Sequence, residues 1–372
     1  MDKQSLKIKV CRAVDEMSGE LADISLFLHR HPELGGQEVQ AAQLLTTAAS
    51  RLGFQVRQNI SGYETAFIAS KGRRGPRIAF LAEYDALPEL GHACGHNLIA
   101  AMSFGAAAAF AEVAGDSAVS CLIGCPAEET SGAKVAMAAD GVFDSLAAAL
   151  IVHPADSNQL GGTAYATHPL QVTFSGRAAH VASKTDKGKN ALDALVMFYQ
   201  GLHQLRQTFT QETILAGILT KTGIAPNIVP AEAEGRFTVR ALSAAYLEET
   251  VLPAVKNLAR GIAMATGTTV TTVHYEPLFK ELINDARLMD LFKANMEALG
   301  EQVILLKPDE ADGSTDVGNV SHAAPTIHPD LFIGNNLSAH TPEFASAAGS
   351  EFAQKRLLVG AKAMAMTAID LL

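Results

Sequence analysis

Side chains able to bind a metal ion gather in the stretch 81–97, which reads LAEYDALPELGHACGHN. It places acids, two histidines and one thiol in a turn-rich segment behind a short apolar run. Cys94 and His96 are separated by a single glycine, which lets the backbone turn sharply. A thiolate and an imidazole that converge in one loop are suitable zinc ligands. One such pair is weak support, so the metal hypothesis depends on matching residues elsewhere.

Matching residues follow two later apolar runs. Glu128 and Glu129 come after 119–125, and His153 comes after 147–152. Adjacent acids are common in solvated turns, but two carboxylates at one site can divide the work. One binds metal, and the other, with its pKa raised by its neighbour, takes a proton from water. A single histidine after an apolar run is more often structural, and only its place at a third strand end favours a ligand.

The apolar runs predict a sheet that positions these side chains. Runs 77–82, 119–125 and 147–152 have the composition of buried strands, and the helices 98–110 and 133–140 are expected between them. This alternation is typical of a mostly parallel or mixed sheet flanked by helices. Ligand sites in such folds lie at the carboxyl ends of the strands, which is where the candidate residues stand.

A second domain is expected at about 168–278, where strands of alternating polarity follow the order β-α-β-β-α-β of a ferredoxin-like unit. The remaining residues, 1–167 and 279–372, would form one discontinuous catalytic domain that includes His340. The elements expected in the second domain are strands 168–175, 213–221, 231–241 and 268–275 and helices 190–209 and 244–267. Those expected outside the sheet core are helices 6–30, 38–52, 285–299 and 350–371 and strands 54–57, 302–306 and 327–333.

Composition excludes several classes of function. The 372 residues are 48% hydrophobic and carry a net charge of −10, which argues against nucleic acid or an anionic membrane as a partner. The four cysteines form no disulfide framework, and the N-terminus lacks the apolar core of a signal peptide, so a cytoplasmic location is expected. The apolar run 98–110 is too short to span a bilayer.

Two polar residues of the expected second domain suit substrate binding. Arg240 lies on the open face of strand 231–241 and can clamp a carboxylate bidentately, although a solvated strand face explains it equally well. Asn227 lies in an extended turn between two prolines and is open to either reading. The chain has no G-x-S-x-G elbow, no P-loop, no dinucleotide fingerprint and no spaced CxxC pairs.

Taken together, six motifs resemble the aminoacylase/carboxypeptidase-G superfamily of dinuclear zinc amidohydrolases, metallopeptidase family M20. The resemblance covers nearly the whole chain, in the branch of p-aminobenzoyl-glutamate hydrolases, auxin-conjugate hydrolases and β-alanyl dipeptidases. Asn97 and the pair Glu83-Tyr84 favour the aminobenzoyl-glutamate and dipeptidase side. The motifs are LHRHPEL (28–34), EYDALP (83–88), GHACGHN (91–97), PAEE (126–129), GRAAH (176–180), and NIVP (227–230) followed by Arg240.

The resemblance implies a zinc-peptidase-like catalytic domain with an inserted lid and dimerisation domain, and two divalent ions, zinc or else manganese or cobalt. It implies that Cys94 bridges the metals, at a place held by Asp in other branches. The other implied ligands are His96 and His153 for one metal and Glu129 and His340 for the second.

The resemblance also implies roles around the metals. Glu128 matches the general acid/base, and Asp85 matches the acid that orients a metal-site histidine. His180 matches a lid residue that reaches into the partner subunit's active site. Asn227 and Arg240 match groups that hold the substrate's carbonyl and carboxylate. The superfamily's His-x-Asp is replaced here by Glu83-Tyr84-Asp85, which leaves the roles of Glu83 and His92 open.

The expected function is metal-dependent hydrolysis of an amide bond in a small substrate with a free carboxylate: an N-acyl amino acid, aminobenzoyl-glutamate or a dipeptide. A homodimer formed through the lid domain is expected. Two alternatives stay open: a cysteine hydrolase that uses Cys94 with His96 or His92, and a metal-binding homodimer without catalytic activity.

Overall fold

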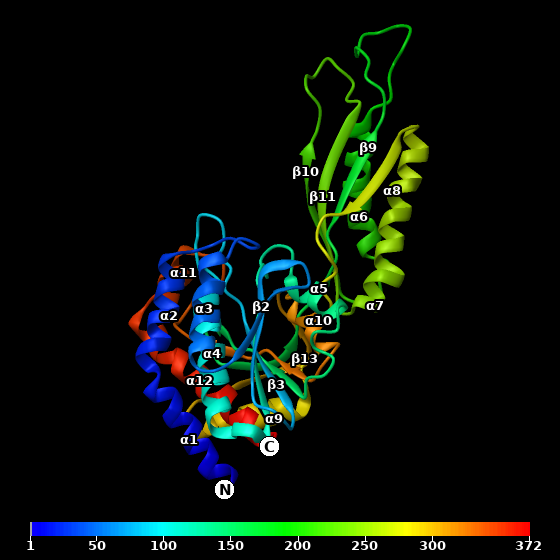
Figure 1. Ribbon diagram of the computed structural model, residues 1–372. Coiled ribbons are helices and arrows are strands. Elements are labelled where there is room, and N and C mark those ends of the chain that lie inside the picture. The colour runs from blue at the N-terminus through cyan, green and yellow to red at the C-terminus, as the bar shows by residue number, and fades with distance from the viewer. Residues whose placement is uncertain (1) are drawn as a thin grey trace. The chain divides into compact units, whose positions relative to one another are not determined.

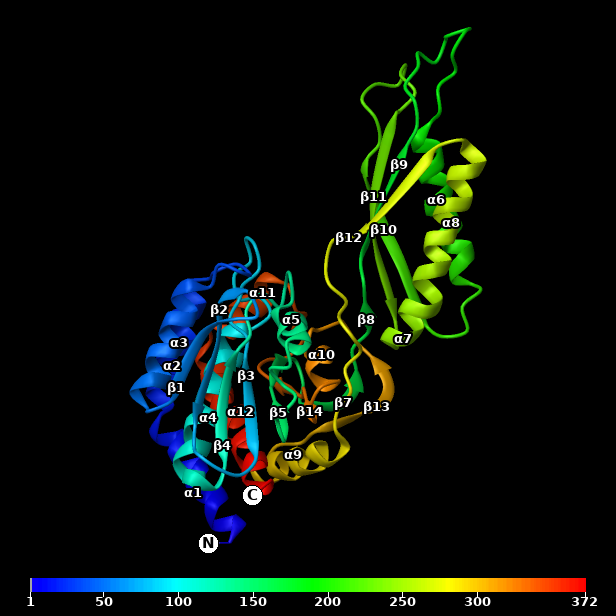
Figure 2. The same cartoon turned by 45° about the vertical axis from the view of Figure 1, so that its right-hand side comes forward.

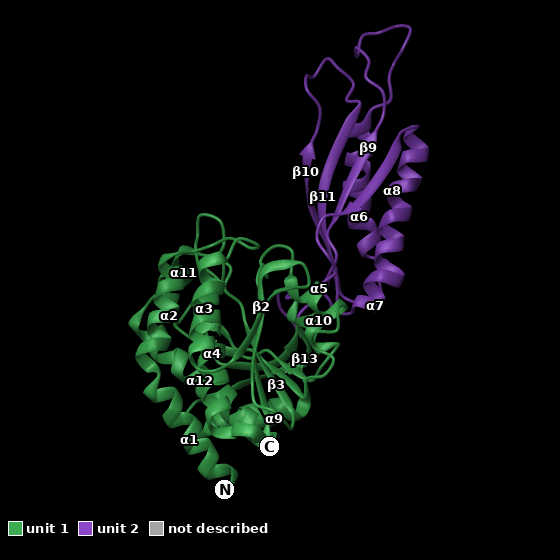
Figure 3. Cartoon of the chain, in the orientation of Figure 1, with its two compact units in different colours: residues 1–163, 282–310, 316–372 green, residues 164–281, 311–315 purple. Residues whose placement is uncertain are grey.

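The computed structural model describes residues 2–372, which divide into two compact units (Figure 3). The first unit comprises the described residues up to Thr163 together with Leu282–Glu310 and Asp316–Leu372. The second unit comprises Ala164–Glu281 and Ala311–Thr315. The sequence placed the inserted domain at 168–278 and did not anticipate the short segment 311–315.

The first unit (Figure 1) is built on a six-stranded mixed sheet of order β1-β2-β4-β3-β5-β14, whose strands are labelled in Figure 2. β4, β3, β5 and β14 run parallel, and β2 and β1 add antiparallel at one edge. The predicted fold class of the catalytic domain is therefore confirmed. The strands that lie mainly in this unit are β1 (Gln55–Ile60), β2 (Tyr63–Lys71), β3 (Arg77–Ala82), β4 (Val119–Gly124), β5 (Ala148–Leu150), β6 (His153–Ala155), β7 (Gln159–Thr163), β13 (Ile304–Ala311), β14 (Thr326–Ile327) and β15 (Asp330–Phe332).

Helices cover this sheet. The Ala-rich α4 packs across β3 and β4 and against α12, α1 and α2. Small side chains let α4 approach the sheet closely, and nearly every residue of this helix is buried. The helices are α1 (Lys3–Glu16), α2 (Ser18–Arg30), α3 (Val39–Arg51), α4 (His96–Ala114), α5 (Ala133–Ala139), α9 (Ala286–Ala298), α10 (Val317–Ser321), α11 (Pro342–Ala348) and α12 (Glu351–Asp370).

The segment His96–Ser117, formed by α4 and a short 3₁₀ turn, has the length and composition of a membrane-spanning helix, although 83% of its most apolar window is buried inside the protein. The sequence expected a shorter buried helix at 98–110. Burial on all sides explains the uniformly apolar composition of α4 as that of a core helix.

Several expected elements differ in the structure. The predicted helix 6–30 breaks at Met17 into α1 and α2. Strand β2 was not predicted, and neither was a small sheet of order β13-β7-β15-β6. The predicted strand 327–333 splits into β14 and β15 around Pro329, which has no N–H to donate. The short strands β6, β14 and β15 are specified by pairing with distant segments, which local sequence does not reveal.

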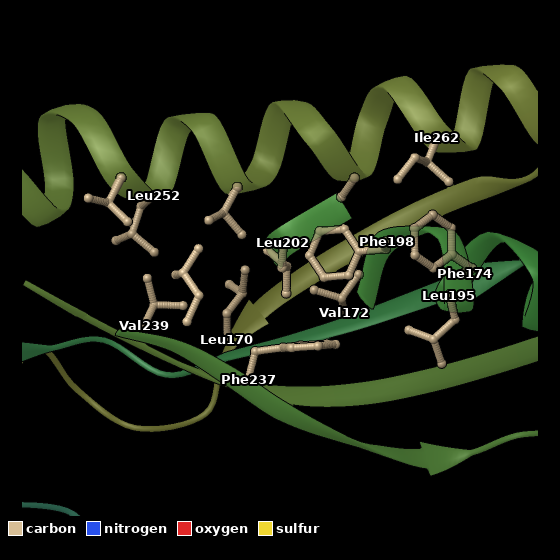
Figure 4. Close-up of a cluster of buried hydrophobic side chains, with 14 of the residues drawn as sticks. Leu170, Val172, Phe174, Leu195, Phe198, Leu202, Phe237, Val239, Leu252 and Ile262 are labelled. Carbon is tan, nitrogen blue, oxygen red and sulfur yellow. The ribbon is translucent and has the colours of Figure 1, made fainter. Parts of the chain in front are cut away.

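The second unit has the predicted ferredoxin-like order β9-α6-β10-β11-α8-β12 (Figure 2). Its sheet runs β10-β11-β9-β12, all neighbours antiparallel, with β8 paired to β11. Apolar side chains of α6 and α8 meet those of the sheet in one core that contains Phe174, Phe198 and Phe237 (Figure 4). The elements are β8 (Ala166–Thr167), β9 (Leu170–Ser175), β10 (Thr213–Lys221), β11 (Glu232–Ala241), β12 (Thr269–His274), α6 (Ala191–Arg206), α7 (Ala244–Tyr246) and α8 (Leu252–Thr266).

Candidate metal centre

The loop between β3 and α4 carries the first candidate ligands. His96 is the first residue of α4, and Gly95 precedes it in the left-handed conformation with a φ of 78°. A Cβ at Gly95 would lie 2.8 Å from Cγ of Pro154. Glycine is therefore required at position 95 for both its conformation and its size. The backbone amide of His340 donates a hydrogen bond to the carbonyl of Ala93 at 2.9 Å, which connects a residue far along the chain to this loop.

Gly95→Ala is expected to lower the free energy of unfolding by about 2–4 kcal/mol, because it adds a left-handed alanine and a clash with Pro154. Gly36→Ala is the matched control, since Gly36 has a φ of 82° and an added Cβ there would have no atom within 4 Å. It should cost only about 1–2 kcal/mol. Urea denaturation measures both. Equal losses would mean that close packing at Gly95 does not matter.

One group of candidate ligands contains Cys94, His96 and His153, whose ligand atoms all lie within 4.8 Å of one another. Sγ of Cys94 is 3.3 Å from Nε2 of His153. Ligands at zinc distances of 2.0–2.3 Å in a tetrahedron are about 3.3–3.8 Å apart, so this spacing suits a metal ion. His153 begins β6 rather than ending the preceding strand, as the sequence had suggested.

A second group contains Cys94, Glu129 and His340, again within 4.8 Å. Oε1 of Glu129 lies 3.3 Å from Nε2 of His340, yet this oxygen is buried without a hydrogen bond among the described residues. A cation between these atoms would satisfy it. The two groups share Cys94, so the structure brings all five candidate ligands together, and their nitrogen, sulfur and oxygen donors fit divalent metal ions.

Asp85 links one group to the other. Its Oδ1 accepts from Nδ1 of His96 at 3.0 Å, and its Oδ2 accepts from the backbone amide of Glu129 at 2.9 Å. Nδ1 of His153 donates in the same way to the carbonyl of Pro154 at 2.8 Å. These hydrogen bonds engage Nδ1 of both histidines and leave Nε2 available as the metal ligand, which is the arrangement that fixes a metal-binding imidazole.

Asp85→Asn is expected to weaken metal binding about 10- to 100-fold, because the amide cannot accept from both partners with the strength of a carboxylate. Competition titration against a chromogenic chelator measures the affinity. The exposed Asp156, whose Oδ1 accepts a hydrogen bond from the hydroxyl of the adjacent Ser157, supplies Asp156→Asn as the control. Unchanged affinity in Asp85→Asn would show that the carboxylate does not support the centre.

Glu128 stands beside both groups without belonging to either. Ala127, just before it, is held at a φ of 60°, unusual for a residue other than glycine, and its amide donates to Oε1 of Glu38 at 2.8 Å. Burial and the carboxylates of Glu83 and Asp316 raise the pKa of Glu128 well above its usual range. A half-buried carboxyl with a raised pKa is suited to exchanging a proton with a substrate or water.

Three residues near the centre escaped the sequence prediction. Lys134 and Asp316 form an ion pair at 2.5 Å, and Lys134 also pairs with Glu83 at 2.7 Å. Burial opposes the charge of Lys134, but the carboxylates of Asp316 and Glu83 outweigh it and raise the pKa of Lys134 well above its usual value. His328 follows the end of β14, and its ring centroid is 5.5 Å from that of His153.

Of these three residues, His328 could have been identified from the sequence. Ile327-His328-Pro329 repeats the pattern Val152-His153-Pro154 at the end of another parallel strand. Of the two residues whose roles stayed open, Glu83 places Oε2 3.7 Å from Nε2 of His96. His92 is buried, which lowers its pKa to about 3, and it belongs to none of the ligand groups found among residues 2–372.

The remaining candidates lie in the second unit, at opposite ends of β11. His180 and Asn227 are neighbours on adjacent loops, since His180 bridges to Ile228 and the amide of Val181 donates to the carbonyl of Asn227 at 3.1 Å. Arg240 lies near the other end of the strand, roughly 25–30 Å away at 3.3 Å per residue. The structure therefore groups two of the three and separates the third.

Comparison with known proteins identifies relatives over the full length. The chain is 36% identical over 391 residues to the Xaa-Arg dipeptidase of Mus musculus, with 99% of this chain and 89% of that protein covered. It is 29% identical over 437 residues to one of the subunits of the p-aminobenzoyl-glutamate hydrolase of Escherichia coli, with 96% and 90% covered.

Residues 169–261 match the peptidase dimerisation domain of the M20 family. A Bacillus subtilis structure described as a dinuclear metal-binding M20 peptidase superposes with a TM-score of 0.73 over 96% of this chain and 99% of that one. At 20% identity this likeness shows the fold alone. The full-length identity to the dipeptidase shows more: the chain belongs to the M20 family of peptidases, hydrolases of C–N bonds.

Proposed function

We propose that this protein is a metal-dependent amidohydrolase that cleaves the amide bond of a small substrate with a free carboxylate. The observation that carries the proposal is the pair of ligand groups that share Cys94, with the carboxyl of Glu128 beside them. Cys94 with His96 and His153 would hold one divalent ion. Cys94 with Glu129 and His340 would hold the other. The thiol favours zinc, and manganese or cobalt would also fit the oxygen and nitrogen donors.

Two ions bound in this way would supply an activated water and polarise the scissile carbonyl. The chain's own residues supply the proton transfers. The carboxylate of Glu128 takes a proton from the attacking water and then delivers it to the nitrogen of the leaving amine. Asp85 keeps His96 in the tautomer that leaves Nε2 free, so that the site is ordered before substrate arrives.

Dipeptides are the first substrate class to test. The relative that shares 36% of its residues with this chain is named for cleaving Xaa-Arg dipeptides, whereas the aminobenzoyl-glutamate hydrolase subunit shares 29%. N-acyl amino acids and aminobenzoyl-glutamate remain within the proposed class, because each combines a scissile amide with a free carboxylate. Arg240 is the proposed partner of that carboxylate.

We further propose that the protein acts as a homodimer through its second unit, because residues 169–261 match a peptidase dimerisation domain. His180 and Asn227 lie at one end of β11 and Arg240 at the other, which favours a site that takes its groups from two subunits. His180 would stabilise the oxyanion in the partner's active site, and Asn227 would hold the carbonyl. Coexpressed His180→Ala and Glu128→Ala chains test this, since only mixed dimers would regain activity.

The function is tested with a substrate panel on protein reconstituted with zinc, manganese or cobalt. The panel contains Xaa-Arg and β-alanyl-lysine dipeptides, p-aminobenzoyl-glutamate and N-acetyl amino acids. Hydrolysis that is lost with a chelator and restored by metal supports the proposal. Hydrolysis that survives the chelator but is lost on alkylation of the metal-loaded protein would instead support a cysteine hydrolase. Tightly bound metal without turnover on any of these substrates would support an inactive scaffold.

One observation already weighs against the cysteine hydrolase. Burial raises the pKa of the Cys94 thiol to about 12, so the thiol is not a ready nucleophile in the absence of a cation. The hydrogen bond and the charge of His96 lower the pKa of Cys94 without overcoming burial, and Glu129 and Glu128 raise it further. A metal ion is the cation that would convert this thiol to a thiolate ligand.

A further inference from the structure

We propose that Lys134 is a positioning residue of the metal centre. Its ammonium pairs with Glu83 and Asp316, two of the three carboxylates that cluster there with Glu128, and it holds Glu83 and Asp316 where they support His96 and Glu128. The inference rests on the proposed function, because the groups that Lys134 positions are those assigned above to metal binding and proton transfer.

Lys134 is held in place by two buried ion pairs and a backbone hydrogen bond. Nζ lies 2.5 Å from Oδ1 of Asp316 and 2.7 Å from Oε1 of Glu83. The backbone amide of Lys134 donates to Oδ2 of Asp316 at 3.0 Å, so this carboxylate is held by two groups of one residue. All three side chains are excluded from water, with relative exposures of 0–1%. Burying a lysine is costly unless its charge is paired, and here it is paired twice.

The positive charge of Lys134 also stabilises the carboxylates around it. Oxygens of Glu83, Glu128 and Asp316 all lie within 4.8 Å of one another, which is close enough to share a metal ion. In a buried site, carboxylates at this distance repel strongly. An ammonium fixed on α5 supplies the compensating charge permanently, without the exchange that a dissociable ion would undergo.

Two contacts connect this cluster to the candidate metal centre. Oε2 of Glu83, the oxygen that Lys134 leaves free, lies 3.7 Å from Nε2 of His96. Glu128 belongs to a group with Glu83 and Asp316 and also to a group with His96 and Glu129. Without Lys134, Glu83 and Asp316 would move apart, and both His96 and Glu128 would lose the neighbours that face them.

The test compares Lys134→Met, which removes the charge at similar length, with Lys355→Met. Lys355 pairs with Glu351 at 2.7 Å on the exposed face of α12, so it is a matched control. Each variant is reconstituted with Co²⁺, and the visible spectrum, the metal content, kcat and KM are recorded. Lys134→Met should alter the cobalt spectrum and lower kcat per metal-loaded site at least 100-fold, with KM changed less than threefold. Lys355→Met should match the wild type in every measurement.

If Lys134→Met does not fold, the double variant Lys134→Met/Asp316→Asn is measured in its place. It removes one buried negative charge together with the positive one. It should fold and bind metal but retain the low kcat. Lys134→Arg, which preserves the charge, should restore part of the spectrum and of kcat. A cobalt spectrum and a kcat per loaded site equal to those of the wild type in the folded Lys134 variants would overturn the inference. If the wild type and Lys355→Met themselves bind no metal or hydrolyse no substrate, it is the proposed function that fails.

Discussion

Glu128→Gln is expected to lower kcat by about three to four orders of magnitude while both metal ions stay bound, because it removes the proposed proton carrier and none of the proposed ligands. Glu128 lies within 4.8 Å of His96 and Glu129 but outside both groups that share Cys94. The amide is nearly isosteric with the carboxyl, so the fold should be unaffected. Steady-state kinetics together with metal analysis of the same sample measures the two effects separately.

The neighbouring Glu129→Gln is the matched control, because it makes the same chemical change one residue away. Glu129 belongs to the ligand group with Cys94 and His340, so this variant should lose metal as well as activity. Added metal should restore part of the activity of Glu129→Gln and none of the activity of Glu128→Gln. Turnover near the wild-type rate in Glu128→Gln would refute its assignment as the acid/base.

Cys94→Ala is expected to have the largest effect on metal content, because Cys94 is shared by the two ligand groups to which the two metal ions are assigned. Removing one shared ligand weakens both sites, so bound metal should fall from two ions per chain to well below one. Activity should fall with it. Metal analysis after dialysis against metal-free buffer measures the loss.

Cys94→Asp separates the loss of a ligand from the loss of a cysteine. A carboxylate can bridge two ions, and the resemblance implies that Asp holds this place in other branches of the superfamily. This variant should retain two ions and a measurable fraction of activity. Activity that is lost equally in Cys94→Ala and Cys94→Asp, with metal retained in both, would point to the thiol as a nucleophile.

The sequence predicted those residues of the candidate site whose proximity follows from strand order. Glu128 and His153 were recognised because buried apolar runs end just before them, and parallel strands bring such ends together at one edge of a sheet. The ferredoxin-like order of the second unit was also predicted and is confirmed. Both predictions rest on periodicity and on the order of elements, which local sequence records well.

The parts that the sequence did not predict depend on distant contacts. Lys134 and Asp316 are 182 positions apart, and nothing in either local sequence marks them as a buried pair. Their importance is visible only when the fold excludes water from both. The strands β6 and β7 are equally hidden, because three to five residues acquire strand geometry only by pairing with remote segments. His328 was obscured by being placed inside a predicted continuous strand.

The number and position of bound metal ions test the central claim most directly. Crystals grown with zinc and measured at its absorption edge should show two anomalous peaks about 3.5–4 Å apart, both next to Sγ of Cys94. One peak should contact His96 and His153, and the other Glu129 and His340. A metal-loaded crystal with a single peak, or with peaks remote from Cys94, would contradict the account.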